Sequence, residues 1–291
     1  MSDYVIISDS TTDLTSAMIS DLKVEILPLH FVIDGKSYAN DPCNEELSGA
    51  EFYELLRGGK TATTVQVNID ACMTAFERHL KEGRNILYIA FSSALSGTFN
   101  SASVAAKTLS EKYPERKIIV IDSLCAAMGE GLLVYLAAEK KNNGASLQEV
   151  AAWVEENKLR VCHLFTVNDL FHLKRGGRVS STSAMFGTML GIKPVLNVDN
   201  DGRLVPCGKV RGRRQALDAL VAKLDETGEN ISEQTIFISH ADSEEDAQYV
   251  GEKIREKHKG CNVIISMIGP VVGAHAGPGT IALFFLGSSR G

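Results

Sequence analysis

Residues 85–98 read NILYIAFSSALSGT, and the fold class can be inferred from this stretch. Residues 85–91 form an almost uninterrupted apolar run of strand length, which is typical of a strand buried on both faces. Two serines, Ser96, Gly97 and Thr98 follow closely, and residues 98–113 predict a helix that ends before Pro114. A buried strand, a polar loop and a helix in this order indicate one unit of a parallel α/β sheet.

The same order recurs through the first half of the chain. Apolar runs predict strands at 4–8, 24–29 and 117–121, and helical periodicity predicts helices at 14–22, 48–56, 68–81, 128–141 and 147–157. We expect Thr12 or Asp13 to cap the first of these helices. Asp34-Gly35 between apolar flanks predicts a hairpin over 31–38. We therefore expect an N-terminal parallel-sheet α/β domain over residues 1–160.

The second half mixes strand pairs with helices. Strands are expected at 161–166, 192–198, 204–210, 235–239, 263–268 and 280–286, and helices at 168–173, 213–224 and 244–257. Asn200-Asp201-Gly202 predicts a hairpin between two of these strands. We therefore expect a C-terminal α+β domain over residues 161–291.

Composition excludes several classes of protein. Hydrophobic residues make up 44% of the 291 residues and charged residues 23%, as in a globular protein. The net charge of −6 argues against a protein built around a nucleic-acid backbone. No apolar run approaches the length needed to cross a bilayer, so stable membrane insertion is not expected. The first residues lack the pattern of a signal peptide, so a cytoplasmic location is expected.

Common catalytic and metal-binding motifs are absent from the sequence. The six cysteines, at 43, 72, 125, 162, 207 and 261, form no CxxC pair, which argues against a zinc or thioredoxin-type site and favours reduced, structural thiols. There is no P-loop, no G-x-S-x-G elbow, no H-E-x-x-H motif and no dinucleotide fingerprint. We therefore expect no catalytic residues, no metal and no nucleotide cofactor in this chain.

Four polar segments, each expected to be a loop, could carry a ligand site, and each has a simpler structural interpretation. They are residues 8–13, 61–68, 92–98 and 269–280. The first three could serve only to cap helices. Free amides and hydroxyls at 92–98 would also suit a carboxylate or a phosphate. In the fourth segment, glycines and prolines surround His275, which is either a site residue or a structural histidine.

Basic residues gather in two places, at 174–178 and at Lys209, Arg211, Arg213 and Arg214. They form either a solvated surface or a docking surface for an anionic partner.

Six motifs in the same order resemble the DegV family of bacterial fatty-acid-binding proteins, the carrier subunits of fatty acid kinase. They are Asp9-Ser10-Thr11-Thr12-Asp13-Leu14; Thr64-Val65-Gln66; Ser92-Ser93-Ala94-Leu95-Ser96-Gly97-Thr98; Leu173-Lys174-Arg175-Gly176-Gly177-Arg178-Val179-Ser180; Ile192-Lys193-Pro194-Val195-Leu196; and residues 269–279, GPVVGAHAGPG. The second motif departs from the family's usual Thr-Ser-Gln-Pro-Ser, because Val65 and Val67 replace its first serine and its proline.

This resemblance implies two domains with a lipid tunnel between them. Thr64, Ser93, Ser96, Gly97, Thr98 and His275 would bind a fatty acid such as palmitate or stearate. His275 and Arg211 would lie where a fatty acid kinase docks, and the kinase would supply ATP and the catalysis. The chain would therefore be a carrier, not an enzyme. No arginine occurs in the expected head-group loops, so neutral donors are expected to hold the carboxylate.

Two other functions are compatible with the same residues. The chain could be an enzyme acting on a phosphorylated small molecule, with residues 92–98 as phosphate loop and His275 as acid or base. It could also be a lipid-sensing regulator, for which the composition offers no nucleic-acid signature. Burial of a methylene is worth about 0.8 kcal/mol, so a 16-carbon tail would gain about 12 kcal/mol before ordering costs, which favours the carrier.

Overall fold

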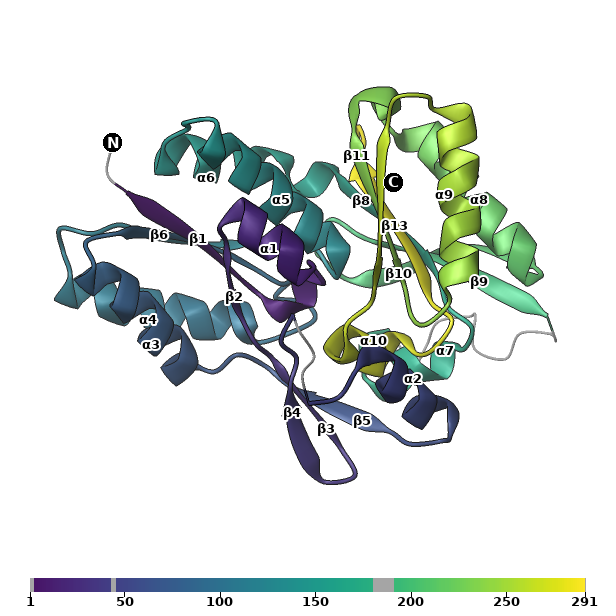
Figure 1. The fold of residues 1–291 in the computed structure, drawn as a ribbon, viewed down its shortest axis with the longest axis horizontal. Helices are drawn as coiled ribbons and strands as arrows, with labels where there is room; N and C mark the ends of the chain where they lie inside the picture. Colours follow the sequence, from purple (N-terminus) through teal and green to yellow (C-terminus); the bar gives the residue numbers. More distant parts are fainter. Residues whose placement is uncertain (1–2, 43–45, 180–190, 291) are drawn as a thin grey trace.

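A computed structural model describes residues 3–42, 46–179 and 191–290. Cys43 and Ser180, which the sequence motifs include, lie outside the described residues. In the described part of the chain, no helix is both long and apolar enough to cross a membrane. The elements form three sheets flanked by helices (Figure 1).

The first sheet is fully parallel, as predicted. Its strands, in spatial order, are β2 (Glu25–Leu27), β1 (Tyr4–Asp9), β6 (Asn85–Ala90) and β7 (Ile118–Asp122). Every residue of β1 and β6 is buried, because helices cover both faces. The helices on one face are α3 (Ile69–Lys81) and α4 (Thr98–Lys112), and those on the other are α1 (Ser16–Leu22), α5 (Met128–Asn142) and α6 (Leu147–Asn157).

The second sheet is mixed and belongs to the second half of the chain. Its strands, in spatial order, are β10 (Leu204–Arg211), β9 (Ile192–Val198), β8 (Val161–Thr166), β13 (Ile281–Leu286), β11 (Thr235–His240) and β12 (Asn262–Met267). Its outer face is covered by α8 (Arg213–Thr227) and α9 (Glu244–Lys257). The parallel sheet and this separate mixed sheet confirm the predicted fold class. The division at residue 160 stays a prediction.

Helix α5 lies between the two sheets (Figure 1). Its first eleven positions include buried residues on every side, which is typical of a helix surrounded by protein. Residues of both sheets join it in one core, for example Ile6 and Leu87 from the parallel sheet and Phe237 and Phe284 from the mixed sheet. The inner faces of the two sheets are therefore packed against the same helix.

A small third sheet was not predicted as a separate unit. It is antiparallel, with β4 (Lys36–Ala39), β3 (His30–Ile33) and β5 (Ala62–Val65) in that order. The turn between β3 and β4 confirms the predicted hairpin. The expectation that residues 61–68 form a loop was wrong, because β5 pairs with β3 along residues 62–65. The β-branched Thr63 and Thr64 suit a strand, but their partner is distant in sequence.

The expectation of a loop over residues 269–280 was also wrong. Residues Pro270–Ala276 form helix α10, which packs against α2 (Gly49–Arg57), β3, β5 and α7 (Leu170–Arg175). Pro270 occupies the start of the helix, where its missing N–H is not needed. Gly273 lies within the helix because a Cβ there would come 2.4 Å from the Tyr53 hydroxyl. Tertiary packing therefore outweighs the poor helix propensity of this glycine-rich segment.

Two smaller expectations also need correction. Helix α1 is capped by Thr15, whose hydroxyl accepts from the Met18 N–H, and not by Thr12 or Asp13. Residues Ser10–Thr12 instead form a 3₁₀ turn capped by Asp9. The basic turn at 174–178 begins as helix, because Lys174 and Arg175 complete α7.

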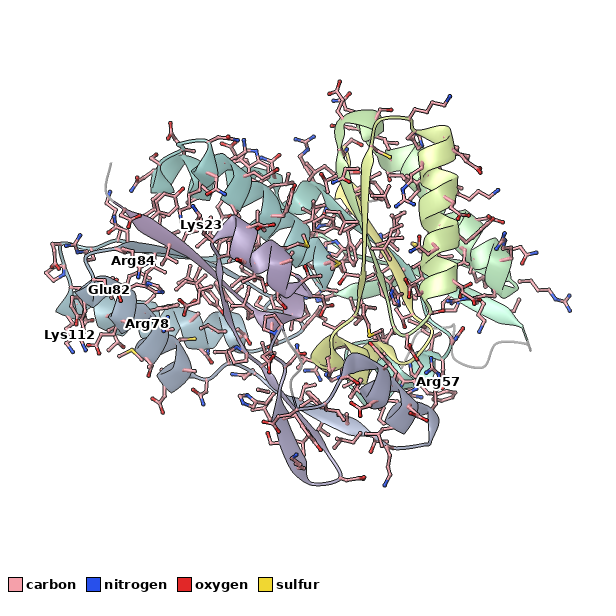
Figure 2. The ribbon with its side chains drawn as sticks, viewed as in Figure 1. Lys23, Arg57, Arg78, Glu82, Arg84 and Lys112 are labelled. Atoms are coloured by element: carbon pink, nitrogen blue, oxygen red, sulfur yellow. The ribbon has the colours of Figure 1, made fainter. Side chains whose placement is uncertain are left out.

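Charged side chains are concentrated far from the junction of the sheets. Figure 2 shows Arg78, Arg84 and Lys112 at the outer end of the parallel sheet. They form ion pairs with Glu25, Glu82 and Glu77, respectively. Exposed pairs of this kind contribute little to stability, and they surround no cavity.

Candidate functional site

A cavity of about 160 Å³ lies where the ends of the parallel strands meet the inner face of the mixed sheet. Most of its wall is aliphatic or aromatic, and polar groups are few. The apolar lining consists of Leu29, Phe91, Leu95, Ala126, Ala127, Phe165, Leu173, Val198, Leu204, Ile268, Val271, Val272, Ala276, Ala282 and Phe284. The polar lining consists of Thr11, Thr64, Gln66, Ser96, Arg178, His163, His275 and Thr280, with Gly97 beside them. An apolar cavity with a few placed polar groups suits a mainly hydrocarbon ligand.

One end of the cavity is polar and partly open to solvent. There, Thr64 of β5 and His275 of α10 meet, with 2.9 Å between the Thr64 Oγ1 and the His275 Nε2. Gly176 allows this approach, because a Cβ at that position would lie 2.2 Å from the His275 Nδ1. The structure thus brings together two predicted site residues that are 211 positions apart in the sequence.

The start of helix α4 forms the opposite side of this polar end. Ser96 and Gly97 line the cavity, and Thr98 is buried behind them with its Oγ1 3.0 Å from the Ser96 Oγ. Gln66 lies against Gly97 so closely that a Cβ there would come 2.2 Å from the glutamine Oε1. The glutamine also donates to the Ser101 hydroxyl at 3.1 Å. Gly97 is therefore required by close packing at the mouth.

Arg178 is the site residue that the sequence interpretation missed. It follows α7 and lines the same polar end, where its Nε donates to the Leu95 carbonyl at 3.2 Å and its Nη1 to that of Gly176. The expectation that only neutral donors surround the head group was therefore incomplete. The guanidinium has five N–H groups, so these two bonds leave it able to donate to a ligand. The only local signal was the Gly176-Gly177-Arg178 turn, which does not reveal where the arginine points.

His275 is neutral at physiological pH. Burial is the main cause that lowers its pKa, and the positive charge of Arg178 lowers it further, to about 4. A neutral imidazole has one N–H donor and one acceptor nitrogen, so it can orient an anion without neutralising it. Together with Arg178, it gives this end of the cavity one fixed positive charge and several neutral hydrogen-bonding groups.

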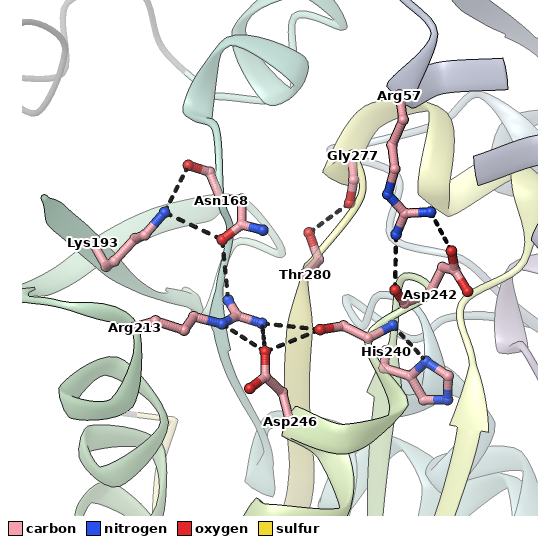
Figure 3. Close-up of polar contacts among 10 residues, drawn as sticks. Arg57, Asn168, Lys193, Arg213, His240, Asp242, Asp246, Gly277 and Thr280 are labelled. Atoms are coloured by element: carbon pink, nitrogen blue, oxygen red, sulfur yellow. Dashed lines mark hydrogen bonds and ion pairs between the residues drawn. The ribbon is translucent and has the colours of Figure 1, made fainter. Parts of the chain in front are cut away.

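Contacts from three elements hold the turn that follows α10 (Figure 3). Thr280 donates to the carbonyls of Ala276 and Gly277, both at 3.0 Å. The Nδ2 of Asn168 would lie 1.9 Å from a Cβ at Gly279, so its amide packs directly on the turn. Lys193 from β9 in turn donates to Asn168 at 3.2 Å. These contacts fix the end of α10 that carries His275.

The floor beside Thr11 rests on buried carboxyl groups. The Thr11 hydroxyl contacts Asp9 Oδ1 and, at 2.8 Å, the Oε2 of Glu130 from α5. Asp9 also accepts from the backbone N–H groups of Thr11 and Phe91. Asp13 accepts from the Gly269 N–H at 2.9 Å and so anchors the start of α10. Residues 8–13 therefore act both as a cap and as a wall of the cavity.

Three predicted residues lie elsewhere. Ser93 is exposed and is not among the residues that line the cavity, although its N–H donates to Asp122. The Ser92 hydroxyl donates to the Gly202 carbonyl at 2.9 Å, so it serves to join the two halves of the chain. Arg211 is exposed at the end of the edge strand β10, away from the lining residues. No cluster that could hold a metal ion occurs within residues 3–42, 46–179 and 191–290.

The comparisons with known proteins agree with this geometry. The family model described as "Uncharacterised protein, DegV family" matches residues 3–288. The chain belongs to the DegV family. A DegV domain-containing protein of Clostridium perfringens is 47% identical over 290 residues, which is 100% of this chain and 99% of the relative.

Two solved structures of DegV proteins are similar to this chain. One is DegV of Bacillus subtilis, a fatty acid binding protein, with a TM-score of 0.86 and 29% identity over 99% of this chain and 100% of that one. The other is the fatty acid kinase (Fak) B3 protein of Streptococcus pneumoniae, loaded with linoleic acid. It has a TM-score of 0.84 over 98% of this chain and 99% of that one, but at 23% identity it supports only the shared fold.

Proposed function

We propose that this chain binds one long-chain fatty acid in the cavity and presents its carboxylate to a fatty acid kinase. The observation that carries the proposal is the division of the cavity wall into a long apolar part and one polar end. A hydrocarbon tail suits the former, and a carboxylate suits the latter. The fatty-acid-binding DegV protein of Bacillus subtilis, which shares the family and the fold, supports the same ligand class.

The head group would lie among Thr64, Ser96, Arg178 and His275. These side chains come from four separate segments and all line the polar end of the cavity. Arg178 supplies the one positive charge, and the Thr64 and Ser96 hydroxyls supply neutral donors. Ser93 is left out of this site because its side chain lies at the surface.

The division of labour with the kinase follows from the chemistry of the site. The polar end offers donors for a carboxylate, and its neutral histidine leaves the negative charge on the ligand largely intact. The carboxylate oxygen would then act as the nucleophile toward the phosphoryl group that the kinase brings with ATP. The exposed Arg211 remains our proposed contact with the kinase, and His275 lies at the mouth that the kinase must reach.

The alternative, an enzyme for a phosphorylated small molecule, finds less support. A phosphate would need most of the loop at 92–98, but the Ser92 hydroxyl is engaged with Gly202 and Ser93 faces solvent. The apolar extent of the cavity has no use for a small phosphate ester.

Native mass spectrometry of the purified protein tests the proposal. We expect a bound molecule with the mass of a long-chain fatty acid, which organic solvent releases. Thr64→Ala removes a donor to a charged group, worth about 1.5–3 kcal/mol, so it should weaken retention about 10- to 100-fold. Thr63→Ala, its exposed neighbour on β5, is the matched control and should retain the lipid. A protein that binds no fatty acid, as purified or when one is added, would refute the proposal.

A further inference from the structure

The cavity follows one face of the mixed sheet. Thr280, just before β13, and Ala282 and Phe284 within it all line the cavity, as expected for alternate residues of a strand. Phe165 and His163 on β8 pair with Ala282 and Phe284, respectively, and line it too. The cavity therefore extends from the end of α10 to Phe284, a distance of about 13 Å along the strand.

The lining stops at one row across the sheet. The row contains Phe284 on β13 and His163 on β8, which are paired. Val198 of β9 and its partner Leu204 of β10 continue it on the far side. The next pair on the same face, Val161 and Leu286, is absent from the lining among the described residues. Phe284 and His163 are each only 2% exposed, so this pair closes the cavity along β8 and β13.

His163 cannot easily turn out of this row. One of its ring nitrogens, Nδ1, lies 2.9 Å from the Val161 carbonyl, and the other, Nε2, accepts from the Ala126 N–H at 3.1 Å. A Cβ at Gly129 would come 2.1 Å from the same Nε2, so α5 packs directly against the ring. Phe284 meets the imidazole edge to face, with 5.5 Å between ring centroids.

The turn behind His163 is anchored as well. Leu124 and Ala127 have φ of 52° and 50°, a conformation that non-glycine residues adopt only when the surroundings hold them. Buried Arg290 donates to the Leu124 carbonyl at 2.6 Å and contacts the Cys125 Sγ at 2.9 Å. Ala126 and Ala127, which line the cavity, are therefore fixed from behind.

We propose that Phe284 and His163 form an end-stop that sets the longest acyl chain this protein accepts. The inference rests on the proposed fatty acid function and adds the residues that determine chain length. Because both nitrogens of His163 are engaged, Phe284 is the member of the pair whose truncation lengthens the cavity without freeing a buried polar group. A chain longer than the native ligand must displace the phenyl ring.

Phe284→Ala should shift the preferred fatty acid to a longer chain. Each methylene that the new space accepts should tighten binding about fourfold, which corresponds to about 0.8 kcal/mol. The measurement is competition for the protein by a series of saturated fatty acids, with native mass spectrometry of the bound fraction. Phe285→Ala is the matched control, because this neighbour on β13 faces α8 and α9 instead of the cavity.

The outcomes separate the end-stop from the function itself. A longer optimum for Phe284→Ala and an unchanged optimum for Phe285→Ala support the end-stop. If wild type and Phe284→Ala bind fatty acids with the same optimum, the end-stop is wrong while the fatty acid function stands. If wild type binds none of the series, both are wrong. Phe284→Leu, which keeps a buried apolar side chain, should shift the optimum in the same direction by less, and covers the case in which the alanine variant does not fold.

Discussion

Glu130 should be a neutral carboxylic acid at pH 7, and Glu130→Gln should reveal this in the stability of the protein. Glu130 is fully buried on α5, with its Oε1 3.2 Å from the Ser8 hydroxyl and its Oε2 2.8 Å from the Thr11 hydroxyl. Ser8 also contacts the Ile89 carbonyl at 2.7 Å, and Thr11 also contacts Asp9. Two hydroxyl protons cannot serve four such contacts, so a proton on Glu130 is needed for a third.

The expected magnitude follows from proton linkage. Burial, and then the charge of Asp9, raises the pKa of Glu130 well above its ordinary 4.5. Between pH 4.5 and the raised pKa, the folded protein holds one proton that the unfolded chain has released. The stabilisation is complete below pH 4.5 and is lost as the pH rises through this window, at about 1.4 kcal/mol per pH unit. Glutamine keeps an N–H donor but has no proton to lose, so this slope disappears.

Urea unfolding at a series of pH values above 4.5 measures the effect. The free energy of unfolding of wild type should fall relative to that of Glu130→Gln by about 1.4 kcal/mol per pH unit, until the pKa of Glu130 is passed. Glu111→Gln, on the exposed surface of α4, is the control and should run parallel to wild type. If the Glu130→Gln profile also runs parallel to wild type, the carboxyl is not held neutral and the reasoning fails.

The remaining predictions concern the polar end of the cavity. His275→Ala should retain bound lipid but lose most phosphorylation by the kinase, because a misplaced carboxylate can cost on the order of 100-fold in rate; assay of acyl phosphate on lipid-loaded protein would contradict it by showing full activity. Arg178→Gln should raise the pKa of His275 above about 4, because the neighbouring positive charge is removed. An NMR titration of the imidazole measures this, and an unchanged pKa would show that the two side chains do not interact.

Local patterns were sufficient where each element depends on its own residues. The apolar run at 85–91 predicted β6, which is buried at every position because helices cover both faces. Asp34-Gly35 predicted the hairpin of β3 and β4, since both conformations with positive φ lie within the turn. The sequence also placed Thr64, Ser96 and His275 in polar segments, and all three line the cavity.

Long-range contacts determined what local patterns could not. Strand β5 exists because it pairs with β3, and α10 exists because it packs on α2, β3 and β5. Arg178 enters the cavity wall while Ser93, within an expected ligand loop, faces solvent. The composition and order of the chain thus determined the sheet type, the family and most of the head-group residues. The direction of each side chain and the length of the cavity depend on partners far away in sequence, and only the folded structure brings those partners together.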